Sequence, residues 1–157
     1  MDLRKQFWNS ILEIARTNKD VIVLVGDLGF SFFEQFREEL PDQFINCGIA
    51  EQNLIGVASG LALAGKLPYC YSNSIFLLFR AFEQVRNDVC FNNANVKLIG
   101  TGASGFLGFS HNLVGDEKEE DLLKNLPIET YYPKNEKELE SDMTESYLKG
   151  KPTFIKI

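Results

Sequence analysis

The sequence predicts an α/β domain with three layers, built on a mostly parallel, six-stranded sheet. Short aliphatic runs alternate with segments of helical periodicity about six times along the 157 residues. The first run, residues 21–25, reads Val-Ile-Val-Leu-Val, the continuous apolar pattern of a strand buried on both faces. No repeat or low-complexity linker interrupts the alternation. We therefore expect one domain over residues 1–157.

In the first half of the chain, local patterns predict five elements. Leu3, Phe7 and Ile11 recur at four-residue spacing, which predicts a helix that ends near Asn18. Gly65 fits the C-cap of a later helix. The remaining expected elements are strands at 21–25, 43–46 and 67–71 and a helix at 51–64, with a polar stretch, 34–42, between the first two strands.

The second half continues the alternation. The expected elements are a helix from about 75 to 91, a strand at 96–100, a short helix near 119–125, a strand at 128–131, a helix at 136–148 and a strand at 153–157. Ligands of parallel sheets bind beyond the carboxyl ends of the strands. We therefore expect the functional site among residues 26–31, 47–51, 72–76 and 100–111.

The composition excludes several classes of partner. With 16 Lys plus Arg against 22 Asp plus Glu, the net charge is −6, so we expect neither nucleic acid nor an anionic membrane as a partner. The longest apolar stretch, 75–79, is far shorter than a membrane helix, and no signal-peptide pattern opens the sequence. Three widely spaced cysteines fit reduced thiols. We expect a cytoplasmic protein with no metal site of its own, because zinc-type spacing is absent.

Residues 100–105 spell Gly-Thr-Gly-Ala-Ser-Gly, a GxGxxG pattern directly after an expected strand. A dinucleotide site would continue into an amphipathic helix. Residues 106–115 contain two more glycines and no helical period. We interpret the motif as a turn that shapes one wall of a site.

The strongest segment is residues 44–53, Phe-Ile-Asn-Cys-Gly-Ile-Ala-Glu-Gln-Asn. Glu51 is expected in the first turn of a helix, where the helix dipole stabilises a carboxylate, and this placement alone requires no chemical role. However, Gly-Ile-Ala-Glu-Gln-Asn resembles the glutamate motif in the pyrimidine-binding domain of transketolases, which are thiamine diphosphate enzymes.

The resemblance extends through nearly the whole chain. Arg4-Lys5 resembles an Arg-Lys pair of the family, and residues 27–31 resemble its Asp-Leu-x-x-Ser turn. Residues 75–79 are similar to its Thr-Phe-x-x-Phe segment, and residues 80–86 to an Arg-Ala-Phe-Asp-Gln-Ile-Arg run. Residues 105–111 depart from the family's Gly-Glu-Asp-Gly-Pro-Thr-His, because they keep the histidine and lose both acidic residues.

The resemblance implies roles for individual residues. Glu51 would bind a ring nitrogen of the cofactor's aminopyrimidine and share a proton there, and His111 would contact substrate and shuttle protons. A lone histidine can also be purely structural. Asp27 matches a cofactor-side aspartate, or it closes an Asx turn. Arg4 and Ser31 match residues that contact a sugar phosphate, although Arg4 also fits a solvated helix face.

The resemblance also implies an aromatic ring stacked on the pyrimidine. Phe76, Phe79 and Phe82 are the candidates. Their i, i+3, i+6 spacing fits ordinary core packing along a helix equally well.

The family's diphosphate-binding turn is missing. That turn reads Gly-Asp-Gly and is followed by an Asn, whereas residues 26–28 read Gly-Asp-Leu. The resemblance therefore implies that this chain holds only the aminopyrimidine half of thiamine diphosphate. The family's diphosphate-binding and C-terminal domains are not expected in it, and a separate diphosphate-binding subunit would bind the rest of the cofactor with Mg²⁺.

The function implied is that of a pyrimidine-binding subunit in a split transketolase-like enzyme, which moves a two-carbon ketol unit between sugar phosphates. It would associate with itself and with the diphosphate-binding subunit, as a heterotetramer. The lost acidic pair beside His111 keeps other enzymatic readings open: a nonstandard sugar, a 1-deoxyxylulose-5-phosphate synthase-like reaction or a 2-oxo-acid reaction. A non-catalytic docking module is the alternative from another class.

Overall fold

Six parallel strands form a single sheet in the computed structural model, which describes residues 2–103, 105 and 108–157. Ser104 of the GxGxxG pattern, and Phe106 and Leu107 of the Gly-rich segment, lie outside the described residues. The strand order is β2-β1-β3-β4-β6-β5. The strands are β1 (Val21–Val25), β2 (Phe44–Asn46), β3 (Leu67–Asn73), β4 (Lys97–Thr101), β5 (Glu129–Tyr131) and β6 (Thr153–Lys156). Every pairing is parallel, which confirms the expected fold class.

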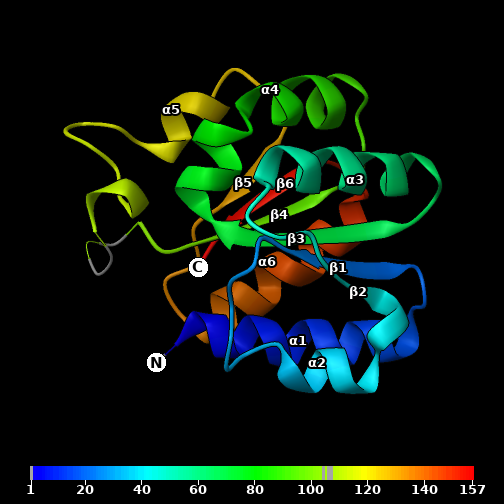
Figure 1. Cartoon of the computed structure of the whole chain (residues 1–157). Helices are drawn as coiled ribbons and strands as arrows, with labels where there is room; N and C mark the ends of the chain where they lie inside the picture. The colour runs from blue at the N-terminus through cyan, green and yellow to red at the C-terminus, as the bar shows by residue number, and fades with distance from the viewer. Residues whose placement is uncertain (1, 104, 106–107) are drawn as a thin grey trace.

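Helices cover both faces of the sheet, and the three layers are visible in Figure 1. One face carries α1 (Leu3–Thr17), α2 (Glu34–Glu39) and α6 (Glu136–Lys149). The other carries α3 (Glu51–Leu63), α4 (Phe82–Gln84) and α5 (Glu119–Leu123). Strand β1 shows why two cores form. Val23 packs into the core under α1 and Leu24 into the core under α3, so its continuous apolar run serves both faces.

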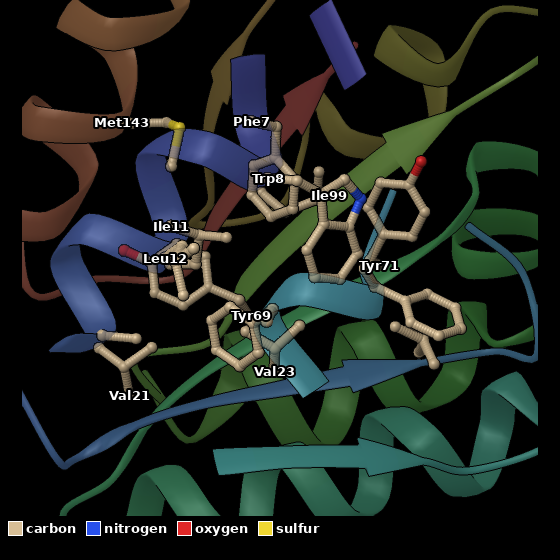
Figure 2. Close-up of a cluster of buried hydrophobic side chains, with 14 of the residues drawn as sticks. Phe7, Trp8, Ile11, Leu12, Val21, Val23, Tyr69, Tyr71, Ile99 and Met143 are labelled. Atoms are coloured by element: carbon tan, nitrogen blue, oxygen red, sulfur yellow. The ribbon is translucent and has the colours of Figure 1, made fainter. Parts of the chain in front are cut away.

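The core on the α1 face is rich in aromatic side chains (Figure 2). The Phe7 ring stacks on Tyr71 of β3 with centroids 5.7 Å apart, and the Trp8 ring lies 5.1 Å from the same tyrosine. This packing fixes α1 along the sheet. Because Arg4 lies one turn before Trp8, α1 also brings Arg4 to the carboxyl end of the strands.

Two segments differ from the expected elements. Residues 34–39 form α2, which the sequence did not predict because Phe36 is the only side chain that this short helix buries completely. Residues 75–91 were expected as one helix, but they form two π-helical segments, η2 (Phe76–Arg80) and η3 (Val85–Phe91), on either side of α4. The i to i+5 bonds of a π-helix widen each turn, so residues three apart no longer share a face as they do in an α-helix.

The first two glycines of the GxGxxG pattern have local steric reasons. A Cβ on Gly100 would lie 2.7 Å from the Phe154 ring and 2.8 Å from Cβ of Ser74. Gly102 has a φ of +74°, which L side chains rarely adopt. The next described element is a short 3-10 turn, η4 (Phe109–His111), not an amphipathic helix. These features support a turn and not a dinucleotide-binding loop.

No helix among the described residues is both long enough and apolar enough to cross a membrane. Cys47, Cys70 and Cys90 are free thiols.

Candidate active site

A cavity of about 340 Å³ lies at the carboxyl ends of β1, β3 and β4. This is the edge where ligands of parallel sheets bind, and it was the expected location. The cavity brings together five of the site residues expected from the sequence, although they come from distant parts of the chain. These residues are Arg4, Asp27, Glu51, Phe76 and His111.

Glu51 begins α3 and is only 1% exposed. The hydroxyl of Ser72, at the end of β3, donates to Glu51 Oε1 over 3.0 Å. The Arg80 guanidinium donates to Glu51 Oε2 over 2.6 Å. Together with the dipole of α3, these two donors compensate a carboxylate that water hardly reaches.

Space beside this carboxylate depends on a glycine. A Cβ on Gly26, directly after β1, would lie 2.8 Å from Ser72 Oγ and 3.1 Å from Glu51 Oε1. Any larger residue would push against the Ser72 to Glu51 hydrogen bond. Gly26 therefore keeps the wall of the cavity open next to Glu51, and both residues line it.

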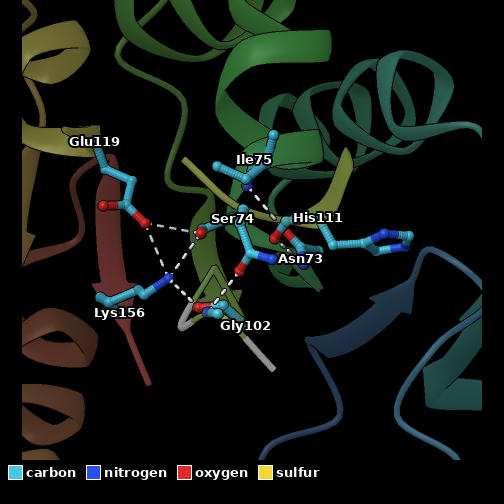
Figure 3. A network of polar contacts seen from close by, with 9 residues as sticks. Asn73, Ser74, Ile75, Gly102, His111, Glu119 and Lys156 are labelled. Carbon is cyan, nitrogen blue, oxygen red and sulfur yellow. Dashed lines mark hydrogen bonds and ion pairs between the residues drawn. The ribbon is translucent and has the colours of Figure 1, made fainter. Parts of the chain in front are cut away.

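The Phe76 ring lies edge-on to the imidazole of His111, with centroids 5.0 Å apart. Asn73, at the end of β3, holds the backbone near them. Its side-chain amide donates to the His111 carbonyl over 3.2 Å, while its amide oxygen accepts from the backbone N–H of Ile75 over 2.9 Å. Figure 3 shows both bonds, with the imidazole directed away from Asn73. Asn73 thus connects the segment that carries Phe76 to the one that carries His111.

A second ion pair lies beside Asn73, also shown in Figure 3. Lys156 Nζ donates to Glu119 Oε1 over 2.9 Å, to Ser74 Oγ over 2.7 Å and to the Gly102 carbonyl over 2.6 Å. The Ser74 hydroxyl also donates to Glu119 Oε1, over 2.8 Å. Burial alone would raise the pKa of Glu119, but Lys156 and Ser74 outweigh it and hold that pKa below its usual value. The network joins the ends of β3, β4 and β6 to α5.

Arg4 and Asp27 are exposed residues at the rim of the cavity. The Arg4 guanidinium pairs with Asp2 over 2.7 Å and lies 4.9 Å from the centre of the Phe32 ring. Asp27 has a φ of +55°, and its carboxylate accepts from the Asn46 side chain over 2.9 Å. Asp27 therefore bridges the turns after β1 and β2.

Three expected site residues do not line the cavity. Ser31 is exposed, has a φ of +74° and donates its backbone N–H to Glu34 Oε1 over 2.8 Å. Phe79 packs against the core on the α3 face, and Phe82 is half-buried. The π-helical turn explains why Phe76 and Phe79 point to different surroundings. The roles expected for Ser31, Phe79 and Phe82 stay predictions.

Ser72, Asn73 and Arg80 hold the site together, and the sequence patterns gave none of them a role. Arg80 stood in a run that resembles the family, but nothing in that run indicated its partner. Arg80 and Glu51 are 29 residues apart, and Ser72 and Glu51 are 21 apart. Among the described residues, no group of three or more His, Cys, Asp or Glu side chains is placed to hold a metal ion.

Comparison with known proteins agrees with this geometry. Residues 1–156 match the family described as the transketolase pyrimidine binding domain. One of the two apulose-4-phosphate transketolase subunits of Phocaeicola vulgatus is 38% identical over 117 residues, which cover 72% of this chain and 38% of that protein. The 6-deoxy-6-sulfo-D-fructose transketolase subunit of a Clostridium species is 31% identical over 99% of this chain and 49% of that protein.

A solved structure, described as a split gene transketolase in an inactive beta4 tetramer, superposes with a TM-score of 0.86. The two chains are 31% identical, and the match covers 98% of this chain and 50% of that one. The chain thus spans half or less of the length of these relatives. It belongs to the transketolase family, as a pyrimidine-binding domain.

Proposed function

We propose that this chain is the pyrimidine-binding subunit of a split transketolase-like enzyme, which uses thiamine diphosphate to transfer a two-carbon ketol unit between sugar phosphates. The observation that carries the proposal is the buried carboxylate of Glu51 at the wall of a cavity. A carboxylate that is 1% exposed is costly to keep in a fold, so its retention at a cavity favours a chemical role.

The residues present fit an aminopyrimidine. The carboxylate of Glu51 can accept a hydrogen bond from a ring edge, Gly26 leaves space beside it, and Phe76 offers an aromatic ring at the same cavity. When bound, thiamine diphosphate supplies a nucleophilic carbon for making and breaking bonds between carbon atoms. Glu51 would hold and share a proton at the pyrimidine nitrogen.

Substrate would contact the rim of the same cavity. His111 borders the cavity and is half-buried, so its imidazole can exchange a proton with a bound hydroxyl group. Arg4 places a guanidinium at the rim, where it fits a phosphate group. Asp27 is proposed near the cofactor, and Ser31 near the sugar phosphate.

The proposal assigns the other half of the site to a separate subunit. That partner would bind the diphosphate with Mg²⁺, and the two kinds of chain would form a heterotetramer. Relatives named as single subunits of a transketolase, and a neighbour described as a split gene transketolase tetramer, support a divided enzyme. The free cysteines agree with work in the cytoplasm.

A second enzymatic candidate rests on a different relative. The 1-deoxy-D-xylulose-5-phosphate synthase of Bacillus cereus is 34% identical over 82% of this chain and 20% of that protein. Because the acidic pair of the transketolase Gly-rich segment is replaced here, substrate preference of that kind fits the sequence as well. A docking module without chemistry would have no use for a buried, cavity-facing Glu51.

The test combines a partner search with one substitution. The chain is co-purified with the product of the adjacent gene, and ketol transfer is assayed with thiamine diphosphate and Mg²⁺. Glu51→Gln keeps the size of the side chain and removes its acid, so we expect at least a hundredfold loss of activity, about the contribution of a positioned acid or base.

Glu83→Gln is the matched control, because Glu83 is an exposed carboxylate close to Arg80 in the chain and should leave activity unchanged. Full activity of the Glu51→Gln complex would contradict the catalytic assignment. A chain that finds no diphosphate-binding partner would favour the docking module.

A further inference from the structure

Arg80 makes two contacts on residues that line the cavity. Its Nη1 donates to Glu51 Oε2 over 2.6 Å, and the central carbon of its guanidinium lies 4.0 Å from the centre of the Phe76 ring. A planar group with N–H donors on its edge is therefore bonded to the carboxylate and stacked on the aromatic ring. An aminopyrimidine is also planar, carries N–H donors and would make the same two kinds of contact.

The pair leaves little of Glu51 free. Ser72 donates to Oε1 and Arg80 to Oε2, so both carboxylate oxygens already have a donor within the chain. A guanidinium does not give up its proton in proteins, so the bond from Arg80 cannot be one in which a proton is shared. Sharing a proton between Glu51 and a ring nitrogen requires an oxygen that Arg80 has released.

Arg80 is able to leave. Its side chain is 42% exposed, whereas that of Glu51 is 1% exposed, so the cation has a path to solvent that the carboxylate does not have. Departure of Arg80 alone would leave a buried charge without its main partner, which is unfavourable. Departure becomes favourable when an incoming N–H donor takes its place at Oε2.

Resting on the proposed function, we infer that Arg80 is part of the pyrimidine site: it occupies Glu51 Oε2 and the face of Phe76 in the free chain and is exchanged for the aminopyrimidine when the cofactor binds. Arg80 then sets the affinity of the site, because only the fraction of molecules with Arg80 displaced is competent to bind.

The test measures binding of the isolated aminopyrimidine, so it does not depend on activity. The full chain is titrated with 4-amino-2-methylpyrimidine and followed by NMR, including the side-chain Nε–H signal of Arg80. We expect Arg80→Met to bind about three- to tenfold more tightly than the unchanged chain, because the competent fraction rises. The Arg80 signal should shift to that of a solvated arginine as the probe binds.

Arg86→Met is the matched control. Arg86 lies in the same stretch of chain, but its guanidinium bonds to Asn87 on the surface, so this variant should bind like the unchanged chain. If Arg80→Met unfolds, Arg80→Gln replaces it, since the glutamine amide can still donate to Glu51 without a charge.

Equal or weaker binding by a folded Arg80 variant would overturn the exchange, and weaker binding would make Arg80 a residue that positions Glu51. Failure of the proposed function is a separate result: the probe binds as expected, but no ketol transfer occurs with any diphosphate-binding partner.

Discussion

Two carboxylate–cation pairs lie at the carboxyl end of the sheet, and they differ in how closed they are. In the pair of Glu119 and Lys156, the side chains are 10% and 21% exposed, and Ser74 and the Gly102 carbonyl complete the hydrogen bonds. In the pair of Glu51 and Arg80, the carboxylate is 1% exposed but the cation is 42% exposed. The first pair is enclosed in a network, whereas the second is open on the side of its cation.

The difference separates two uses of the same chemistry. A closed pair with all its donors and acceptors occupied holds segments together, and it has no free valence for a ligand. An open pair beside a cavity keeps a charged group that a ligand can address. The first should therefore matter more for stability, and the second more for binding.

The largest effect on stability is expected for Lys156→Met. This change leaves the Glu119 carboxylate without its cation in a partly buried place, which should cost about 3–5 kcal/mol of the free energy of unfolding. Urea unfolding of the variant and of the unchanged chain measures it. Lys124→Met is the control, since its pair with Asp121 is exposed and should matter little. A loss for Lys156→Met no greater than for the control would remove the distinction between the two pairs.

A smaller loss is expected for Arg80→Met in the same measurement. Glu51 keeps the hydrogen bond from Ser72, and the adjoining cavity gives water access to the carboxylate, so the cost should be about 1–3 kcal/mol. The comparison becomes sharper if this variant unfolds more easily than the unchanged chain but less easily than Lys156→Met. It breaks if Arg80→Met is the less stable of the two.

The smallest effect concerns pH. The folded-state pKa of Glu119 is lowered below its ordinary 4.5, so the stability that this group contributes is complete above about pH 4.5 and is lost as the pH falls through the folded value. Lys156→Met removes the cause of the lowered pKa. The difference in unfolding free energy between the unchanged chain and this variant should therefore narrow below pH 4.5. A difference that stays constant down to about pH 3 would show that the pair acts through packing alone.

The sequence predicted the sheet because each central strand is buried on both faces and therefore reads as an uninterrupted apolar run, as in residues 21–25. It did not predict α2, whose turn-forming residues are polar. It also treated residues 75–91 as one α-helix. Apolar spacing alone does not distinguish a π-helical turn from an α-helical one, because both bury residues such as Leu77 and Leu78.

The site was predicted in part for a similar reason. Glu51, Phe76 and His111 stood in motifs, so each could be chosen before any contact was known, and the cavity joins them. The pairs that complete the site join residues 21 to 37 positions apart, such as Arg80 with Glu51. Such pairs have no local sequence pattern, since only the folded sheet brings their elements to one edge.

The two outer strands of the sheet, β2 and β5, have only three residues each. Strands this short offer few free backbone groups, so they are poor templates for adding a strand from another molecule. Association of this chain with further subunits should therefore use its helical layers and the carboxyl end of the sheet, and aggregation through edge-to-edge pairing should be suppressed. An assembly with a sheet continuous from one chain to the next through β2 or β5 would contradict this expectation.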